Sequence, residues 1–327
     1  MRVALLLAAA AALRPPAQLR VATFNLLAPV HKSGVGATRE ADDDATWLAR
    51  GARLADFVAE TLGSSDALCL QEWFFEPRWG KMFEEALPRH ALVTSRRRGV
   101  HPHSGEARSD GVAVLVKGKV LAREEVVFDD GRAALIVAVD RSPRPVVVAN
   151  VHLPFGSGGD AAAAQARQAA AVAAAAAAVA ARVDASLALV AGDFNCGAAA
   201  PACAALEAAG WTNVVSASAA EALSSVGGRT CVGATHRTHR GEALCCDHVF
   251  AAGASAFGQC DGAARLVAAA RVAPGGVWDY DFLDKDSDHL PVSATFALPA
   301  AAAAGRADDD DAQDPWLPPW PQPPRPR

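Results

Sequence analysis

SLALVAGDFN, residues 186–195, is an apolar run of strand length that is followed directly by polar residues. A run of this kind, without alternation, is typical of a buried strand that leads into a loop. An alanine-rich stretch precedes it, for which we predict a helix with its N-cap at Asp160 and its end near Val183. We expect the polar residues of its first two turns to lie on its exposed face: Gln165, Arg167 and Gln168.

Apolar runs and helical patterns alternate along the chain on both sides of this stretch. We predict strands over 19–27, 66–72, 110–119, 132–141, 144–153, 243–251, 266–273 and 289–298. Helical patterns cover 47–62, which Gly63 ends, then 75–87 and 203–209. Because strands and helices mix along one continuous stretch, we predict one α/β domain over residues 19–298.

Composition narrows the class of protein. The 327 residues include 31 Lys or Arg and 36 Asp or Glu, giving a net charge of −5, and 51% are hydrophobic. This excludes a protein held on nucleic acid or membrane by bulk positive charge, and it allows a sizeable core. Seven cysteines without a C-x-x-C pair predict buried free thiols rather than a zinc cluster or a complete disulfide framework.

The two ends differ from the body of the chain. Residues 1–18 form a leader in which Arg2 precedes the apolar run 3–13 and Ala17 is a candidate cleavage site. If the leader is a secretory signal, we expect the protein in the secretory pathway. If it is only an alanine-rich extension, we expect the protein in the cytoplasm. Residues 299–327 are acidic and Pro-rich, so we predict a disordered tail. We expect no transmembrane anchor and a monomer.

Eight polar residues share one placement, at or just beyond the end of an apolar run. They are Asn25, Glu72, His152, Asp193, Asn195, Asp247, Asp288 and His289. Singly, each is more often a turn, cap or core residue. Together they favour a site on one rim where several strands end.

The chemistry of this set favours a metal-dependent hydrolase. Its carboxylates are the hard oxygen ligands that Mg²⁺ selects, with Mn²⁺ as the alternative. Asp193 and Asn195 point the same way if the chain is extended, so that one orients a water and the other holds an oxyanion. An Asp beside a His fixes the tautomer of the imidazole, and two histidines allow one base and one acid.

The ordered motifs TFNLLAP, DALCLQE, DGVAVLV, VVVANVHLP, LVAGDFN, CDHVF and SDHLPV resemble the endonuclease/exonuclease/phosphatase superfamily of metal-dependent phosphoesterases. TFNLLAPV and THRTHRGEALCCDHVF are most similar to a plant and algal branch near the deadenylase and nocturnin group. The resemblance implies a four-layer α/β sandwich, with two packed mixed sheets flanked by helices. It also implies attack of water on a phosphoester.

The resemblance also implies roles for the eight residues. Asn25, Glu72 and Asp288 would hold the metal. Asp193 and Asn195 would position the attacking water and the phosphoryl oxygens, and His152 would act as an acid or as a clamp on phosphate. Asp247 would orient His289, so we predict a hydrogen bond of about 2.6–3.2 Å between them.

Two basic clusters and one aromatic trio lie near these motifs. We predict phosphate contacts for Arg237, His239 and Arg240, since their loop directly precedes Asp247. The cluster Arg96, Arg97, Arg98, His101, His103 and Arg108 is either a second positive rim or a solvated loop. Residues 73–75, Trp-Phe-Phe, are expected in the core rather than on a base-stacking surface.

We therefore predict a Mg²⁺-dependent phosphodiesterase, with a nuclease acting on a nucleic-acid strand as the leading interpretation. The alternative is a phosphatase or a lipid phosphodiesterase of the inositol phosphate or sphingomyelin type, because substrate choice lies in loops. A binding module without catalysis is the third class. The presence of all eight motif residues disfavours it.

Overall fold

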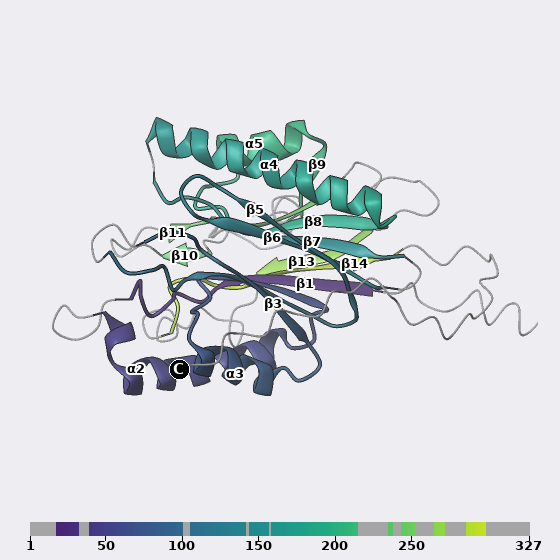
Figure 1. The fold of residues 1–327 in the computed structure, drawn as a ribbon. Helices are drawn as coiled ribbons and strands as arrows, with labels where there is room; N and C mark the ends of the chain where they lie inside the picture. Colours follow the sequence, from purple (N-terminus) through teal and green to yellow (C-terminus); the bar gives the residue numbers. More distant parts are fainter. Residues whose placement is uncertain are drawn as a thin grey trace, which may run out of the picture.

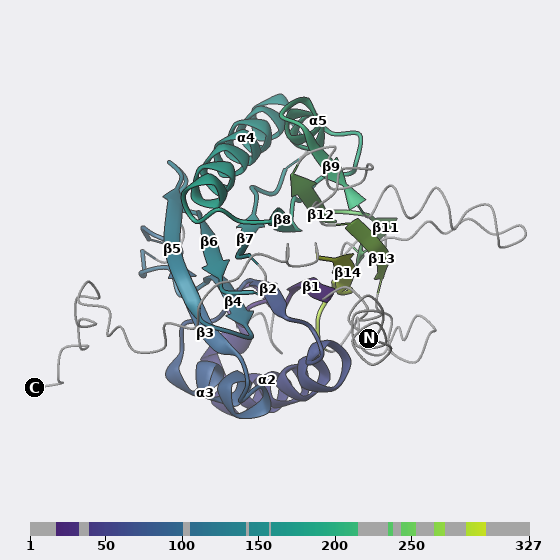
Figure 2. The same ribbon diagram turned by 90° about the vertical axis from the view of Figure 1, so that its right-hand side faces the viewer.

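Two six-stranded β-sheets pack face to face, and helices cover both outer faces (Figures 1 and 2). The predicted four-layer α/β sandwich is confirmed. The computed structural model describes residues 18–32, 39–100, 105–141, 144–156, 158–214, 235–237, 243–252, 265–271 and 286–298. For residues 237, 243 and 265–271 it describes the backbone only.

The first sheet has the order β13–β14–β1–β2–β4–β3. Its strands are β1 (Gln18–Asn25), β2 (Ala67–Gln71), β3 (Ala91–Arg96), β4 (Gly111–Val116), β13 (Arg265–Arg271) and β14 (Val292–Ala297). Only β1 and β2 are parallel neighbours in it. Parallel neighbours need a crossover. Here it consists of η2 (Glu40–Asp42), α2 (Asp44–Phe57) and the π-helical turn η3 (Val58–Leu62).

The second sheet has the order β5–β6–β7–β8–β12–β9. Its strands are β5 (Val120–Val127), β6 (Ala133–Val139), β7 (Val146–His152), β8 (Leu187–Asp193), β9 (Trp211–Asn213) and β12 (Asp247–Ala252). Again one pair is parallel, β7 with β8, and α4 (Gly159–Arg182) is its crossover. Each sheet thus contains one β-helix-β unit.

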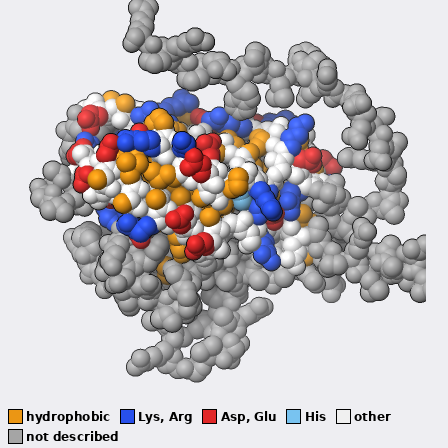
Figure 3. Space-filling view, turned by 90° about the horizontal axis from the view of Figure 1, so that it is seen from below, with side chains coloured by type: hydrophobic (Ala, Val, Ile, Leu, Met, Phe, Trp, Pro, Cys, Tyr) orange, Lys and Arg blue, Asp and Glu red, His pale blue; other side chains and the backbone are white. Residues whose placement is uncertain are grey.

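Three apolar clusters hold the layers together. One lies between the sheets and includes Val21, Val148 and Phe296. A second joins the outer face of the second sheet to α4 and α5 (Pro201–Ala208). The third joins the first sheet to α2 and α3 (Pro77–Ala86), and residues 73–75 belong to it as predicted. The outer face of α2 and α3 mixes charges of both signs where it is described (Figure 3).

Two expectations for the alanine-rich helix are wrong. Gly158 is its N-cap, without a side-chain hydrogen bond, and Asp160 lies in its first turn. Gln165 and Gln168 are buried, whereas Arg167 is exposed as expected. With alanine on every side, hydropathy does not mark the buried face of this helix. Gln165 tolerates burial because its Nε2 donates to two backbone carbonyls, those of Pro154 (2.7 Å) and Asn195 (3.2 Å).

The structure also contains strands that the apolar runs do not predict. β9 has only three residues, and β3 and β5 each contain three consecutive polar residues, at 94–96 and 123–125. The predicted strand over 243–251 is interrupted at Cys245 and Cys246. Its first part, β11 (Ala243–Leu244), pairs instead with β10 (His236–Arg237) in a separate two-stranded ribbon.

Several predictions concern the ends and the cysteines. Residues 1–17 and 299–327 lie outside the described residues, so the leader and the tail stay predictions. None of the helices in the described ranges is long and apolar enough to cross a bilayer. Among the described cysteines, Cys69, Cys203 and Cys246 are buried free thiols, and Cys196 is free and partly buried.

Candidate active site

The candidate site lies at the ends of the two parallel strand pairs. Asn25 is the last residue of β1 and Glu72 follows β2, while His152 and Asp193 end β7 and β8 and lie opposite each other. Asp247 begins β12 and pairs with Asp193 in the antiparallel register. Because the sheets pack face to face, these strand ends meet.

Asp193 is the centre of this group. Its Oδ2 accepts a hydrogen bond from Asn25 Nδ2 at 3.0 Å and lies 3.7 Å from the Nε2 atoms of both His152 and His289. The carboxylate is 1% exposed. Burial raises its pKa to about 7; His289 opposes this shift and Asp247 adds to it. Asp193 is therefore a carboxyl that can exchange a proton near neutral pH.

The predicted hydrogen bond between Asp247 and His289 is present, with Nδ1 of the imidazole 2.9 Å from Oδ2 of the carboxylate. Both side chains are buried. Burial alone would lower the pKa of His289, but Asp247 and Asp193 outweigh it and raise that pKa well above its ordinary value. The imidazolium form is thus favoured, with its Nε2 facing Asp193.

Local hydrogen bonds fix this pair. Thr235 Oγ1 accepts from the backbone N–H groups of Cys246 and Asp247, each at 3.1 Å. Ser287 Oγ accepts from the His289 N–H at 3.1 Å and donates to the Asn25 carbonyl at 2.7 Å. Ser287 therefore ties the segment that carries His289 to the end of β1.

His152 has the opposite protonation preference. Burial, followed by the charge of Arg132, lowers its pKa well below the ordinary value. Arg97, Asp110 and Arg132 line a small pocket with it, and His31 Nε2 lies 3.2 Å from Asp110 Oδ2. Arg97 is largely buried beside Asp110, at 3.6 Å, rather than forming an open basic rim.

Glu72 lies between the backbone and Asn25. Its Oε2 accepts from the Ala28 N–H at 2.9 Å, and its Oε1 accepts from Asn25 Nδ2 at 3.2 Å. The residue has a φ of 53°, in the left-handed region, so the chain turns sharply after β2. The turn directs the carboxylate toward Asn25 and His152, whose Nε2 is 4.0 Å away.

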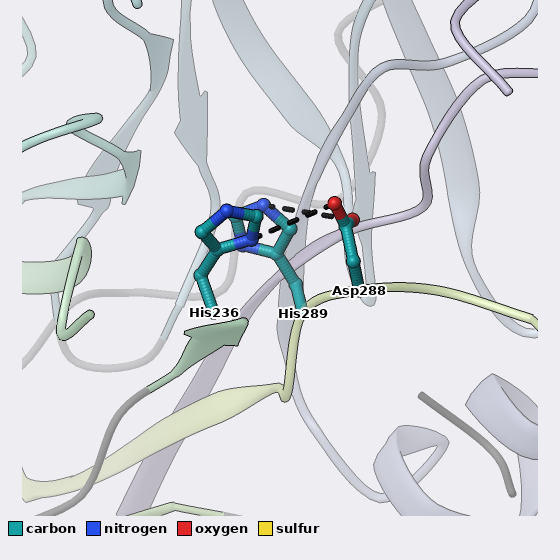
Figure 4. A group of neighbouring side chains, drawn as sticks. All are labelled: His236, Asp288 and His289. Carbon is teal, nitrogen blue, oxygen red and sulfur yellow. Dashed lines mark ion pairs between the residues drawn. The ribbon is translucent and has the colours of Figure 1, made fainter. Parts of the chain in front are cut away.

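The contacts among the described side chains do not bring all three predicted metal ligands together. Asn25 and Glu72 touch, whereas Asp288 lies beside His236 and His289 (Figure 4). Among the described side chains, two groups have ligand atoms within 4.8 Å of one another. They are His236 with Asp288 and His289, and Cys246 with Asp247 and His289.

The loop after β8 differs from the expected geometry. Asn195 has a φ of 51°, so the chain is not extended from Asp193 to Asn195, and that expectation is wrong. The Asn195 N–H donates to Asp193 Oδ1 at 2.8 Å, and its Nδ2 donates to the Leu153 carbonyl at 2.9 Å. Asn195 therefore closes the turn and joins it to the segment after His152. The second amide hydrogen of Nδ2 has no acceptor within the described ranges.

Supporting residues come from positions that the motifs do not mark. Arg50 in α2 is buried, and its guanidinium bonds the carbonyls of Leu26, Leu27 and Asp286 at 2.7–3.0 Å and the Glu40 carboxylate at 2.7 Å. Between the sheets, Gln71 Nε2 donates to Asn150 Oδ1 at 2.7 Å. The sequence signal for these supporting residues is a polar residue within an otherwise apolar pattern. Exposed polar residues give the same signal, so the pattern did not identify them.

The predicted substrate-binding residues are only partly described. Arg237 belongs to β10, and its neighbour His236 forms a β-bridge with His289. His239 and Arg240 lie outside the described residues, as do His101 and His103. A phosphate-contact role for this loop stays a prediction, although the start of the loop lies beside His289.

Comparison with known proteins identifies the family. A model of the endonuclease/exonuclease/phosphatase family matches residues 22–289. The chain belongs to this family. Its members are generally hydrolases that act on phosphoester bonds, and they generally depend on a divalent metal ion. The family resemblance of the motifs is thus confirmed, while the plant and algal branch stays a prediction.

Solved structures share this fold at low sequence identity. A family member from Bacteroides vulgatus is 16% identical with a TM-score of 0.58, over 86% of this chain and 99% of that one. Truncated TDP2 of Caenorhabditis elegans is 16% identical with a TM-score of 0.57, over 86% and 98%. A family member from Beutenbergia cavernae is 18% identical with a TM-score of 0.58, over 90% and 74%. No curated protein matches the chain.

Proposed function

We propose that this protein is a Mg²⁺-dependent phosphodiesterase that cleaves nucleic-acid strands. The observation that carries the proposal is the position of the Asp247–His289 pair against Asp193, a carboxyl with a pKa near 7. A carboxyl that can accept a proton and an imidazolium nitrogen 3.7 Å from it suit the attack of water on a phosphoester.

The donor chemistry fits a hard divalent ion. Each oxygen of Glu72 accepts one hydrogen bond and keeps a lone pair, and Oδ1 of Asp288 is buried without a hydrogen-bond partner among the described residues. Glu72 and Asn25 would hold the ion, and Asp288 would join it directly or through a water. The chemistry supplied by a bound Mg²⁺ is neutralisation of charge on the phosphoester and its transition state.

The side chains of the protein itself would have separate catalytic roles. Asp193 Oδ2 takes a proton from the attacking water. His289, held by Asp247, donates from Nε2 to a phosphoryl oxygen and stabilises the charge that develops there. His152, which is neutral, can donate a hydrogen bond from one ring nitrogen, and Asn25 Nδ2 orients Asp193.

A nucleic-acid substrate is supported by the basic loop that starts at Arg237. Because His236 bridges to His289, this loop begins beside the reacting centre. We expect phosphate contacts from Arg237, His239 and Arg240 on the basis of their charge and their place in the sequence. The charge of such a loop acts locally on a chain whose net charge is −5.

The test is a release assay on poly(A), duplex DNA, sphingomyelin and inositol phosphates, with and without Mg²⁺. We expect Mg²⁺-dependent cleavage of a nucleic acid. Hydrolysis of sphingomyelin or inositol phosphates alone would favour the lipid phosphodiesterase or phosphatase alternative, and hydrolysis of none would contradict the enzyme assignment.

Glu72→Ala tests in the same assay whether Glu72 is a metal ligand. It should abolish Mg²⁺-dependent hydrolysis while the circular dichroism spectrum and thermal midpoint stay close to wild type, because a residue on the rim tolerates truncation. His90→Gln, which changes a histidine bonded to the Ser65 carbonyl, serves as the control and should hydrolyse normally. Wild-type turnover by Glu72→Ala would rule out Glu72 as a ligand.

A further inference from the structure

His236 lies directly against the imidazole of His289. The two ring centroids are 4.3 Å apart with an interplanar angle of 34°, and a β-bridge between the two residues fixes this contact. Both rings present a nitrogen to the carboxylate of Asp288 (Figure 4). The three side chains come from β10 and from the segment before β14, which are far apart in sequence.

The distances among the donor atoms suit one metal ion. His236 Nδ1 is 3.6 Å from Asp288 Oδ2, and His289 Nε2 is 3.9 Å from Asp288 Oδ1. Ligands about 2.0 Å from a tetrahedral zinc ion are about 3.3 Å from each other. All three donor atoms lie within 4.8 Å of one another, so shifts of up to about 1.5 Å would complete three coordination bonds.

Two of these donor atoms are also unsatisfied. His236 Nδ1 and Asp288 Oδ1 are buried and have no hydrogen-bond partner among the described residues. Buried polar atoms without partners cost about 1–3 kcal/mol each. A cation with open coordination positions would remove this cost for both atoms at once.

We propose that His236, Asp288 and His289 form a binding site for a zinc-class transition-metal ion that inhibits the enzyme. Two imidazole nitrogens and one carboxylate suit Zn²⁺ rather than Mg²⁺, which prefers oxygen ligands. The inhibitory consequence rests on the proposed function, because the ion releases the Nε2 proton of His289 to solvent, takes its place and engages Asp288. Hydrolysis then lacks both the proton donor and one proposed Mg²⁺ ligand.

The second group of three potential ligands does not support a metal site in the same way. Cys246, Asp247 and His289 converge on the Nδ1 side of the imidazole, where Asp247 already bonds that nitrogen. Burial raises the pKa of the Cys246 thiol well above its ordinary value, so the thiolate that zinc needs is disfavoured.

Binding is tested with Zn²⁺ alone, titrated into the full-length protein in Mg²⁺ buffer against a chromophoric zinc indicator. We expect His236→Gln to bind Zn²⁺ at least about tenfold more weakly than wild type. His90→Gln, the control for loss of one histidine, should bind like wild type. Equal affinity in wild type and His236→Gln, with both folded by circular dichroism, would overturn the site.

Inhibition is measured in a second experiment. Zn²⁺ should inhibit wild-type hydrolysis reversibly, with recovery on chelation, and inhibition of His236→Gln should need at least about tenfold more Zn²⁺. Equal inhibition of both proteins would contradict the inhibitory role. A protein that binds Zn²⁺ as predicted but hydrolyses no substrate would refute the proposed function and leave the metal site standing.

Discussion

His152 and His289 lie on one rim, yet their surroundings shift their pKa values in opposite directions. Burial and Arg132 keep His152 neutral, whereas Asp247 and Asp193 favour the charged form of His289. The residue type does not decide this difference; burial dominates the pKa of His152, whereas two carboxylates outweigh burial at His289. Two histidines can therefore serve as a neutral hydrogen-bonding group and a proton donor in one site.

Asp193 gives a prediction for the pH dependence of stability. Its pKa rises from 3.8 to about 7 on folding, so its contribution to the free energy of unfolding is full below about pH 4 and is lost as the pH rises through about 7. Asp193→Asn removes this dependence. The variant should gain stability relative to wild type between pH 5 and pH 8.

The measurement is urea unfolding of both EDTA-treated proteins at several pH values. EDTA keeps divalent ions from shifting the titration. A difference in unfolding free energy that stays constant from pH 5 to pH 8 would show that Asp193 has an ordinary pKa.

At the scale of elements, α2 positions two parts of the site through one side chain. Arg50 bonds carbonyls of the loop after β1 and of the segment before Asp288. Its charge is balanced by buried Glu40 at 2.7 Å. The helix thus connects the residues that follow Asn25 to those that precede His289.

Arg50→Met should lower the free energy of unfolding by about 3–5 kcal/mol, because it leaves the Glu40 carboxylate buried without its partner. Arg53→Met is the matched control on the same helix. Arg53 is 54% exposed and pairs with Asp286 at 2.7 Å, so its loss should cost no more than about 1 kcal/mol. The free energy of unfolding of both variants is measured by urea denaturation. An equal decrease in the two variants would contradict the anchoring role of Arg50.

The elements show how far sequence reasoning reaches. Apolar runs predicted β2, β7 and β8, because strands buried on both faces carry polar residues only toward their ends. The edge strand β5 alternates between exposed and half-buried residues, so no such run marks it. In α4, alanine on all sides concealed the buried face that holds Gln165. Periodicity predicts an element only where its faces differ in polarity.

At the scale of the whole molecule, each sheet contributes one parallel pair whose strand ends carry polar residues. The sequence therefore identifies Asn25, Asp193 and His289 as candidate site residues, because each lies at an end of an apolar run. Apart from the Asp247–His289 hydrogen bond, which the family resemblance implied, it could not supply their contacts, since these depend on how two sheets pack. The contribution of Asn195 to a turn, rather than to an extended strand, likewise depends on its left-handed backbone.

Removal of residues 299–327 tests the proposed extent of the domain. The described fold ends with β14 and Leu298, and the composition after it cannot form a packed core of its own. We expect the truncated protein to keep wild-type turnover and solubility. Loss of either, measured by assay and by size-exclusion chromatography, would show that the segment around Trp316 and Trp320 docks on the domain.

The Asp247–His289 pair joins the two sheets, because Asp247 begins β12 in the second sheet and His289 precedes β14 in the first. They are separated by 42 residues in sequence and by 2.9 Å in space. If they act as one unit, removing either side chain removes most of the effect of both.

The most direct test is a double-mutant cycle on kcat/KM with Asp247→Ala, His289→Ala and the combined variant, each checked for folding by circular dichroism. We predict that all three lose activity by similar factors, about 10²–10⁴. Single losses that multiply in the combined variant would contradict the pairing and would make His152 the better candidate for proton transfer.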